Sequence, residues 1–150
     1  MSEHKPDFSL RVARWPEDIP ALRQVREPVF VKEQEVPLEL EWDEDDPRCH
    51  HILAEDPSGR PIGTGRLSPQ GKIGRMAVLK EWRGHGVGSA LLDALVAQAR
   101  TVGLEECLLH AQTSALSFYE RHGFVAEGPE FEEADIPHRL MRQRLGGNGA

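Results

Sequence analysis

The hydrophobic and polar positions along the chain predict alternating strands and helices. Alternation with a period of two indicates strands, and apolar residues four apart at Val87, Leu91, Leu95 and Ala99 indicate one face of the longest helix, 84–102. Gly103 follows that helix as a C-cap residue. The predicted strands are 8–15, 50–56, 60–68, 71–79, 105–112, 124–128 and 138–145, with a loop between the last two; the other predicted helices are 17–34, broken into two pieces at Pro28, and 113–123.

Composition limits the setting in which the chain works. Its 150 residues fit one domain spanning 1–150, with 1–7 and 146–150 as flexible tails. The formal net charge of -7 argues against a nucleic-acid partner and suits a cationic substrate such as an amine. No apolar run reaches membrane-spanning length, and two cysteines without a motif indicate neither a metal site nor a disulfide scaffold, so we expect a cytoplasmic protein.

Three alternating glycines, Gly84, Gly86 and Gly88, stand where the longest helix should begin. Glycine is a poor helix residue, but it lets a ligand approach the backbone closely. The first turn of a helix also offers unpaired N–H groups and the positive end of the helix dipole, which together bind phosphate. The stretch lacks the Lys-Ser/Thr pair of nucleotide-triphosphate loops and the spacing of the dinucleotide fingerprint. It therefore predicts a different kind of phosphate site.

Two motifs that follow one another along the chain resemble the signatures of one family. Residues 83–88, RGHGVG, resemble the R/Q-x-x-G-x-G/A signature of the GNAT superfamily of acetyl-CoA-dependent N-acyltransferases. Residues 115–124, ALSFYERHGF, resemble its second hallmark, A-x-x-F-Y-x-x-x-G-F. The stretches PVFVKEQEVP and EWDEDDPRCHHILA are similar to the ElaA- or YjcF-like branch, and the resemblance spans about residues 8–145.

The resemblance implies a fold and a bound acyl donor. The fold is an α/β (α+β) single domain with a mixed, mostly antiparallel sheet, helices on both faces, and strands four and five splayed apart around acetyl-CoA. Many relatives carry an asparagine before the second motif, where this chain has Thr113 and Ser114. The residues implied to contact acetyl-CoA are Met76, Ala77 and Val78 for the pantetheine arm, Arg83, Gly84, His85, Gly86, Val87, Gly88 and Ser89 for the phosphates, and Ser114 or Thr113 in place of the asparagine.

The chemistry of acetyl transfer sets further requirements. An amine attacks the thioester, so the oxyanion needs a donor and the departing thiolate of CoA needs a proton. A backbone N–H of Ala77 or Val78 suits the oxyanion, and Tyr119, the one tyrosine of the sequence, suits the proton donor. The general base stays open between Glu33, Glu41, Asp43, His110 and a water chain to the solvent. The candidates on the acceptor side are Phe30, Glu41, Trp42, Asp43 and His110.

Two functions from different classes follow. The first is an N-acetyltransferase that acts on a primary amine of a small molecule or a protein. The second is an acyl-CoA-binding module that senses the donor, or serves as a partner protein, without turnover. The intact Tyr119 favours the enzyme. The sequence does not distinguish a monomer from a homodimer, and it does not identify the acceptor.

Overall fold

The computed structural model describes residues 7–33 and 46–146 of the chain. Its strands and helices follow one another in the order that the hydrophobic pattern predicts. The strands are β1 (Ser9–Val12), β2 (His50–Glu55), β3 (Pro61–Leu67), β4 (Ile73–Val78), β5 (Glu106–Gln112), β6 (Val125–Glu133) and β7 (Ile136–Arg144). The helices are α1 (Ile19–Arg26), η1 (Glu27–Glu33), η2 (Asp46–Arg48), η3 (Lys80–Trp82), α3 (Val87–Thr101), η4 (Thr113–Ala115) and α4 (Leu116–Glu120).

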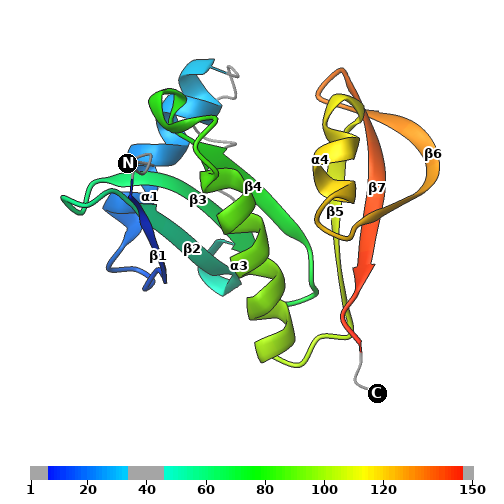
Figure 1. Ribbon diagram of the computed structural model, residues 1–150, viewed down its shortest axis with the longest axis horizontal. Helices are drawn as coiled ribbons and strands as arrows, with labels where there is room; N and C mark the ends of the chain where they lie inside the picture. The colour runs from blue at the N-terminus through cyan, green and yellow to red at the C-terminus, as the bar shows by residue number, and fades with distance from the viewer. Residues whose placement is uncertain (1–6, 34–45, 147–150) are drawn as a thin grey trace, which may run out of the picture.

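The strands form two antiparallel sheets that meet at one point. The first sheet has the order β1-β2-β3-β4 and the second β5-β7-β6. A parallel bridge between Lys72 and Leu108 joins them, with the Leu108 N–H donating to the Gly71 carbonyl over 2.9 Å. From this junction β4 and β5 diverge toward their carboxyl ends (Figure 1). The predicted splay of strands four and five is therefore confirmed.

Helices cover both faces of the first sheet. A Cβ atom placed on Gly63 would meet Val87 and Leu91 of α3, so that face of β3 packs against α3. Side chains alternate along a strand, so Thr64, which is fully buried, points to the opposite face. Helix α1 packs against β3 and β4 there. The core lies between these layers, and Val87, Leu91, Leu95 and Ala99 of α3 are all buried in it, as their spacing predicts.

The helical elements differ from their predicted bounds for local reasons. Helix α3 begins at Val87 instead of residue 84, because Gly84 and Gly86 adopt φ angles of 81° and 86° that a helix cannot contain. The helix ends as predicted, since Leu104 N–H bonds back to the Ala99 carbonyl over 3.0 Å around Gly103. The first helix is in two pieces, as predicted: the α-helix α1 ends at Arg26, and the π-helical η1 begins at Glu27, one residue before Pro28.

The loop expected between residues 128 and 138 is largely strand. Strands β6 and β7 form a long hairpin closed by Ala134 and Asp135, whose φ angles of 53° and 62° are those of a left-handed turn. Many residues of β6 are exposed, so no apolar alternation marks the strand in the sequence. The first strand, β1, is shorter than predicted.

A buried ionic cluster joins the first helix to the sheet. Asp46 in η2 accepts hydrogen bonds from Arg26 of α1 at 2.9 Å and from Arg66 of β3 at 2.8 Å. His51 of β2 completes the cluster by bonding the Asp46 carbonyl over 2.9 Å. Burial of its ring lowers the pKa of His51, so the neutral form is favoured. The cluster fixes η2 and α1 relative to β2 and β3.

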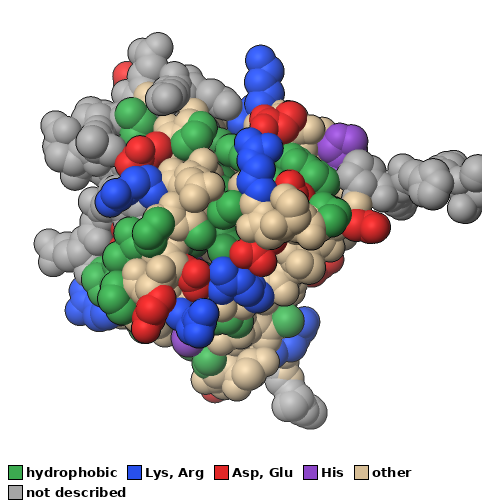
Figure 2. Space-filling view, turned by 90° about the vertical axis from the view of Figure 1, so that its left-hand side faces the viewer, with side chains coloured by type: hydrophobic (Ala, Val, Ile, Leu, Met, Phe, Trp, Pro, Cys, Tyr) green, Lys and Arg blue, Asp and Glu red, His purple; other side chains and the backbone are tan. Residues whose placement is uncertain are grey.

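The face shown in Figure 2 carries acidic and basic side chains that intermingle. Ion pairs among the described residues include Arg11–Asp18 at 2.8 Å and Arg60–Glu81 at 2.9 Å. The Arg11 hydrogen bond lowers the pKa of Asp18 to about 2.

The close approach of α3 to β3 gives a first prediction. A Cβ atom on Gly63 would lie 2.9 Å from the Val87 Cγ1 and 3.0 Å from the Leu91 Cδ1, so these side chains, or the helix that carries them, must shift. We expect Gly63→Ala to lower the free energy of unfolding by about 1–3 kcal/mol in urea titrations. Gly74→Ala on β4 is the control, because its Cβ would meet nothing within 4 Å. Equal stability of the two variants would contradict this packing.

Candidate functional site in the cleft between β4 and β5

Two of the cavities that the described residues line lie along the diverging strands and contain predicted site residues. The first, termed the loop cavity, has a volume of about 380 Å³ and lies at the N-terminus of α3. The second, termed the central cavity, has a volume of about 470 Å³ and lies between β4, β5, α4, η1 and the β6–β7 hairpin. The loop cavity is lined by Val78, Trp82, Arg83, Gly84, Gly86, Val87, Gly88, Ser89 and Phe118.

Strand β4 forms one wall of both cavities. Met76 lines the central cavity and Val78 the loop cavity, while the side chain of Ala77 between them is buried in the core. The pairing of β4 with β3 shifts register here, and Arg75 adopts a φ of 50°. Such a bulge re-aims neighbouring residues. The edge of β4 that faces β5 is thus a backbone edge along which an extended ligand can lie.

The glycine loop forms an open cradle for an anion. The first hydrogen bond of α3 runs from the Ala90 N–H to the Gly86 carbonyl over 3.0 Å, so the N–H groups of residues 87–89 have no partner within the helix. Cβ atoms placed on Gly84, Gly86 or Gly88 would meet nothing within 4 Å. The backbone N–H groups and the positive end of the helix dipole face this free space.

Of the other residues predicted to contact the donor, some line a cavity and some do not. The Arg83 Nε donates to the Val78 carbonyl over 3.0 Å, and its side chain lines the loop cavity. His85 lines neither cavity; its exposed ring packs edge-on against Trp82 at 5.8 Å. Ser114 is also exposed and lines neither cavity, so the structure does not bring it to the site.

A hydrogen-bonded group of three side chains, which the sequence did not predict, lies beside the loop cavity. The His122 Nδ1 lies 2.9 Å from the Asp93 Oδ1, and its Nε2 lies 3.1 Å from the Ser89 Oγ. The His122 ring packs against Phe118 at 5.0 Å. The group fastens the start of α3 to the end of α4. About thirty residues separate its partners, so no spacing in the sequence reveals it.

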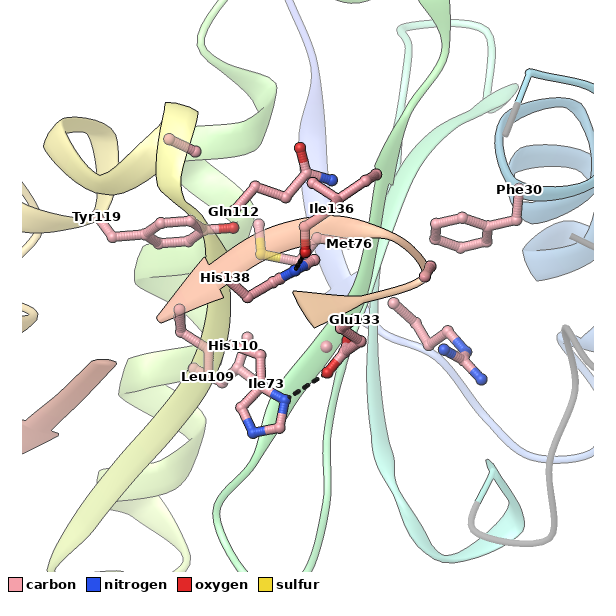
Figure 3. A pocket seen from close by; sticks show the side chains of 14 residues that line it. Phe30, Ile73, Met76, Leu109, His110, Gln112, Tyr119, Glu133, Ile136 and His138 are labelled. Atoms are coloured by element: carbon pink, nitrogen blue, oxygen red, sulfur yellow. Dashed lines mark hydrogen bonds and ion pairs between the residues drawn. The ribbon is translucent and has the colours of Figure 1, made fainter. Parts of the chain in front are cut away.

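Tyr119 enters the central cavity from α4 (Figure 3). A turn at Gly123 fixes its backbone, with the Phe124 N–H donating to the Tyr119 carbonyl over 3.1 Å, and Phe124 packs edge-on against its ring at 6.2 Å. Within the described part of the chain, its hydroxyl makes no hydrogen bond. Burial raises the pKa of Tyr119, so its phenol keeps its proton at neutral pH.

The far wall of the central cavity carries two histidines. His110 of β5, a predicted acceptor-side residue, lies 2.8 Å from the Glu133 Oε1 through its Nδ1. Burial alone would raise the pKa of Glu133, but the hydrogen bond and charge of His110 outweigh it and lower that pKa. His138 of β7 donates its Nδ1–H to the Ile136 carbonyl over 2.7 Å. The sequence analysis missed Glu133 and His138, because it expected a loop before residue 138.

The remaining acceptor-side predictions have different outcomes. Phe30 of η1 lines the central cavity on the side opposite Tyr119 (Figure 3), with 9% of its surface exposed. Glu41, Trp42 and Asp43 lie outside the described residues, and so does the side chain of Glu33. Their roles stay predictions.

Comparisons with known proteins agree with this geometry. Residues 19–145 match the family described as "Acetyltransferase (GNAT) domain". The chain is 44% identical to the uncharacterized N-acetyltransferase YjcF of Bacillus subtilis over 121 residues, 78% of this chain and 86% of that protein. Two solved structures have similar folds. An acyl-CoA N-acyltransferase from Pseudomonas aeruginosa has a TM-score of 0.79 and 31% identity, covering 92% of this chain and 99% of that one. The structure of Escherichia coli ElaA has a TM-score of 0.78 and 28% identity, covering 91% of this chain and 99% of that one.

The chain belongs to the GNAT acetyltransferase family, in its ElaA/YjcF-like branch. It is therefore an N-acyltransferase, and its fold implies an acyl-CoA donor and an amine acceptor. This settles the choice between an enzyme and a non-catalytic binding module in favour of the enzyme. None of the helices in the described ranges has the length and hydrophobicity to cross a membrane.

Proposed function

We propose that the protein transfers an acetyl group from acetyl-CoA to a primary amine by direct attack, with Tyr119 as general acid. The observation that carries this proposal is the Tyr119 phenol, which points into the central cavity and keeps a hydroxyl without a hydrogen bond among the described residues. A tyrosine with only a structural role and this degree of partial burial would normally pair its hydroxyl. A hydroxyl left unpaired is available to a reacting group.

The donor is proposed to lie along the edge of β4. Its pyrophosphate fits the cradle of residues 84–89, where backbone N–H groups and the dipole of α3 favour negative charge. Its pantetheine arm follows the backbone of residues 76–78 from the loop cavity to the central cavity, which Val78 and Met76 line. The thioester then reaches Tyr119, and the N–H of Ala77 or Val78 is proposed to bind the oxyanion.

The residues present meet the needs of the leaving group. As the C–N bond forms and the C–S bond breaks, the departing thiolate requires a proton. A thiol has an ordinary pKa of about 8.5 and a phenol one of about 10, so the two are close enough for proton transfer within the site. The raised pKa of Tyr119 keeps the proton on the phenol until that step.

The acceptor is proposed to approach through the central cavity from the side of Phe30 and the β6–β7 hairpin. It is a primary amine of a small molecule or a protein. The buried cysteines Cys49 and Cys107 form no disulfide, which fits a reducing cytoplasm as the site of action. A direct test measures CoA release from acetyl-CoA over a panel of alkylamines, polyamines, amino acids and lysine peptides. Tight acetyl-CoA binding without turnover of any amine would contradict the proposal.

Gly88 provides a test of the phosphate cradle. It is the second residue of α3, and its Cβ would meet nothing within 4 Å, so an aspartate there fits the fold. An acidic side chain in the first turn also interacts favourably with the helix dipole, which stabilises the helix by about 0.3–1 kcal/mol. We expect Gly88→Asp to keep its thermal stability and yet to lose acetyl-CoA affinity more than tenfold in calorimetry, because its charge repels the pyrophosphate.

Gly88→Asn is the matched control, because asparagine fills the same space without the charge. Its loss of acetyl-CoA affinity should be smaller than that of Gly88→Asp, and the difference should shrink as salt is added. Unchanged affinity in the folded aspartate variant would remove the pyrophosphate from this loop.

Tyr119→Phe tests the general acid. The change removes the hydroxyl and leaves the ring packed against Phe118 and Phe124. We expect kcat to fall by about two to four orders of magnitude with little change in the Kd for acetyl-CoA, because only proton donation is lost. Steady-state kinetics with any working amine give the answer. A variant with full turnover would show that water supplies the proton.

A further inference from the structure

His138 is held in one tautomer within the central cavity. Its side chain is 7% exposed, and its Nδ1 lies 2.7 Å from the carbonyl oxygen of Ile136. A carbonyl can only accept, so Nδ1 carries a proton whatever the charge of the ring. The neutral imidazole therefore bears its lone pair on Nε2. Stacking on Phe131, with ring centroids 6.0 Å apart and planes at 22°, holds the ring in this orientation.

The Nε2 of His138 has no hydrogen-bond partner in the described part of the chain. A buried polar atom without a partner costs free energy, so such atoms are rare in folded proteins and often mark a ligand site. Figure 3 shows His138 between Tyr119 on one side and Phe30 on the other, close to Met76 and Gln112. The ring thus lies where an amine entering from the acceptor side would meet an acyl group on β4.

We propose that His138 is the general base of the reaction. As the amine nitrogen forms its bond to the acyl carbon, one of its protons passes to the His138 Nε2. The C–S bond breaks, and the sulfur takes the proton of Tyr119. Return of a proton from His138 to the phenolate, through water, restores both residues, so amine and acyl-CoA become amide and CoA with no net change in the enzyme. This assignment rests on the proposed acetyl transfer.

His110 is the competing base, since Glu133 orients its ring as a carboxylate orients a catalytic imidazole. Its side chain is 30% exposed, and it also lines a cavity that extends away from Tyr119 toward Lys72 and the junction of β4 and β5. Both histidines line the central cavity with Tyr119, but His138 does not line this second cavity and is far less exposed to solvent, which suits proton transfer from a substrate. The charged and titratable groups that line the cavity around His138 are Arg75 on β4, His110 on β5, Tyr119 on α4 and Glu133 on β6.

His138→Asn tests the assignment, because an asparagine amide can still donate to the Ile136 carbonyl while Nε2 is removed. With an amine that the wild type acetylates, we expect kcat/KM to fall by about two to four orders of magnitude while acetyl-CoA affinity stays within about twofold. Measured with an aromatic amine that does not itself titrate over the pH range studied, the acid limb of the kcat/KM profile reports protonation of the enzyme's base and should disappear. His110→Asn is the matched control and should retain that limb.

A second variant and a spectrum keep the test decisive. His138→Ala leaves a cavity, and added imidazole should restore part of its turnover, whereas imidazole should not rescue Tyr119→Phe. The assignment is overturned if His138→Asn folds, binds acetyl-CoA and keeps the rate and acid limb of the wild type. Imidazole ¹⁵N spectra test the assignment without turnover. A failure of this assignment can therefore be distinguished from a failure of the proposed acetyl transfer. A neutral His138 with its proton on Nε2 would overturn the assignment by itself.

Discussion

The site depends on a pair of neighbouring strands that bond to each other at one end only. At that end Gly71 has a φ of 98°, and a Cβ on it would lie 2.9 Å from the Glu106 carbonyl oxygen, so only glycine allows this approach. The bridge between Lys72 and Leu108 then sets the distance between the sheets. Beyond it β4 and β5 separate, and the cavities, the free edge of β4 and the exposed start of α3 all follow from that divergence.

The two halves of the cleft are built by different means. The half proposed to bind the donor uses the backbone: a helix N-terminus, glycines with left-handed φ angles and a strand edge, with the Ser89–His122–Asp93 group holding α3 against α4. The half proposed to bind the acceptor uses side chains from η1, β5, α4 and the β6–β7 hairpin. Backbone groups can bind the same donor in many relatives, while side chains can vary with the acceptor, which is consistent with one fold serving many substrates.

The difference between backbone groups and side chains explains which parts of the site the sequence could predict. The buried face of α3, the glycine loop and Tyr119 are encoded within short contiguous stretches whose spacing has a direct physical meaning. Arg75 at its bulge and His138 at the start of β7 take their places from pairing with other strands, β3 and β5, and no spacing within either segment reveals this. The polar surface of β6 conceals in the sequence the hairpin that carries His138, so the pattern offers no candidate base there. Glu33, Glu41 and Asp43 keep their predicted roles untested.

Hydrogen–deuterium exchange with and without acetyl-CoA tests most directly whether this cleft holds the donor. The amides of residues 76–78 on β4 and of 86–89 at the start of α3 should be protected by acetyl-CoA, because the ligand would bond to backbone groups there. The hairpin tip around Ala134 should change less, since it faces the acceptor. Protection confined to other segments, while calorimetry shows acetyl-CoA binding, would contradict the placement of the donor between β4 and β5.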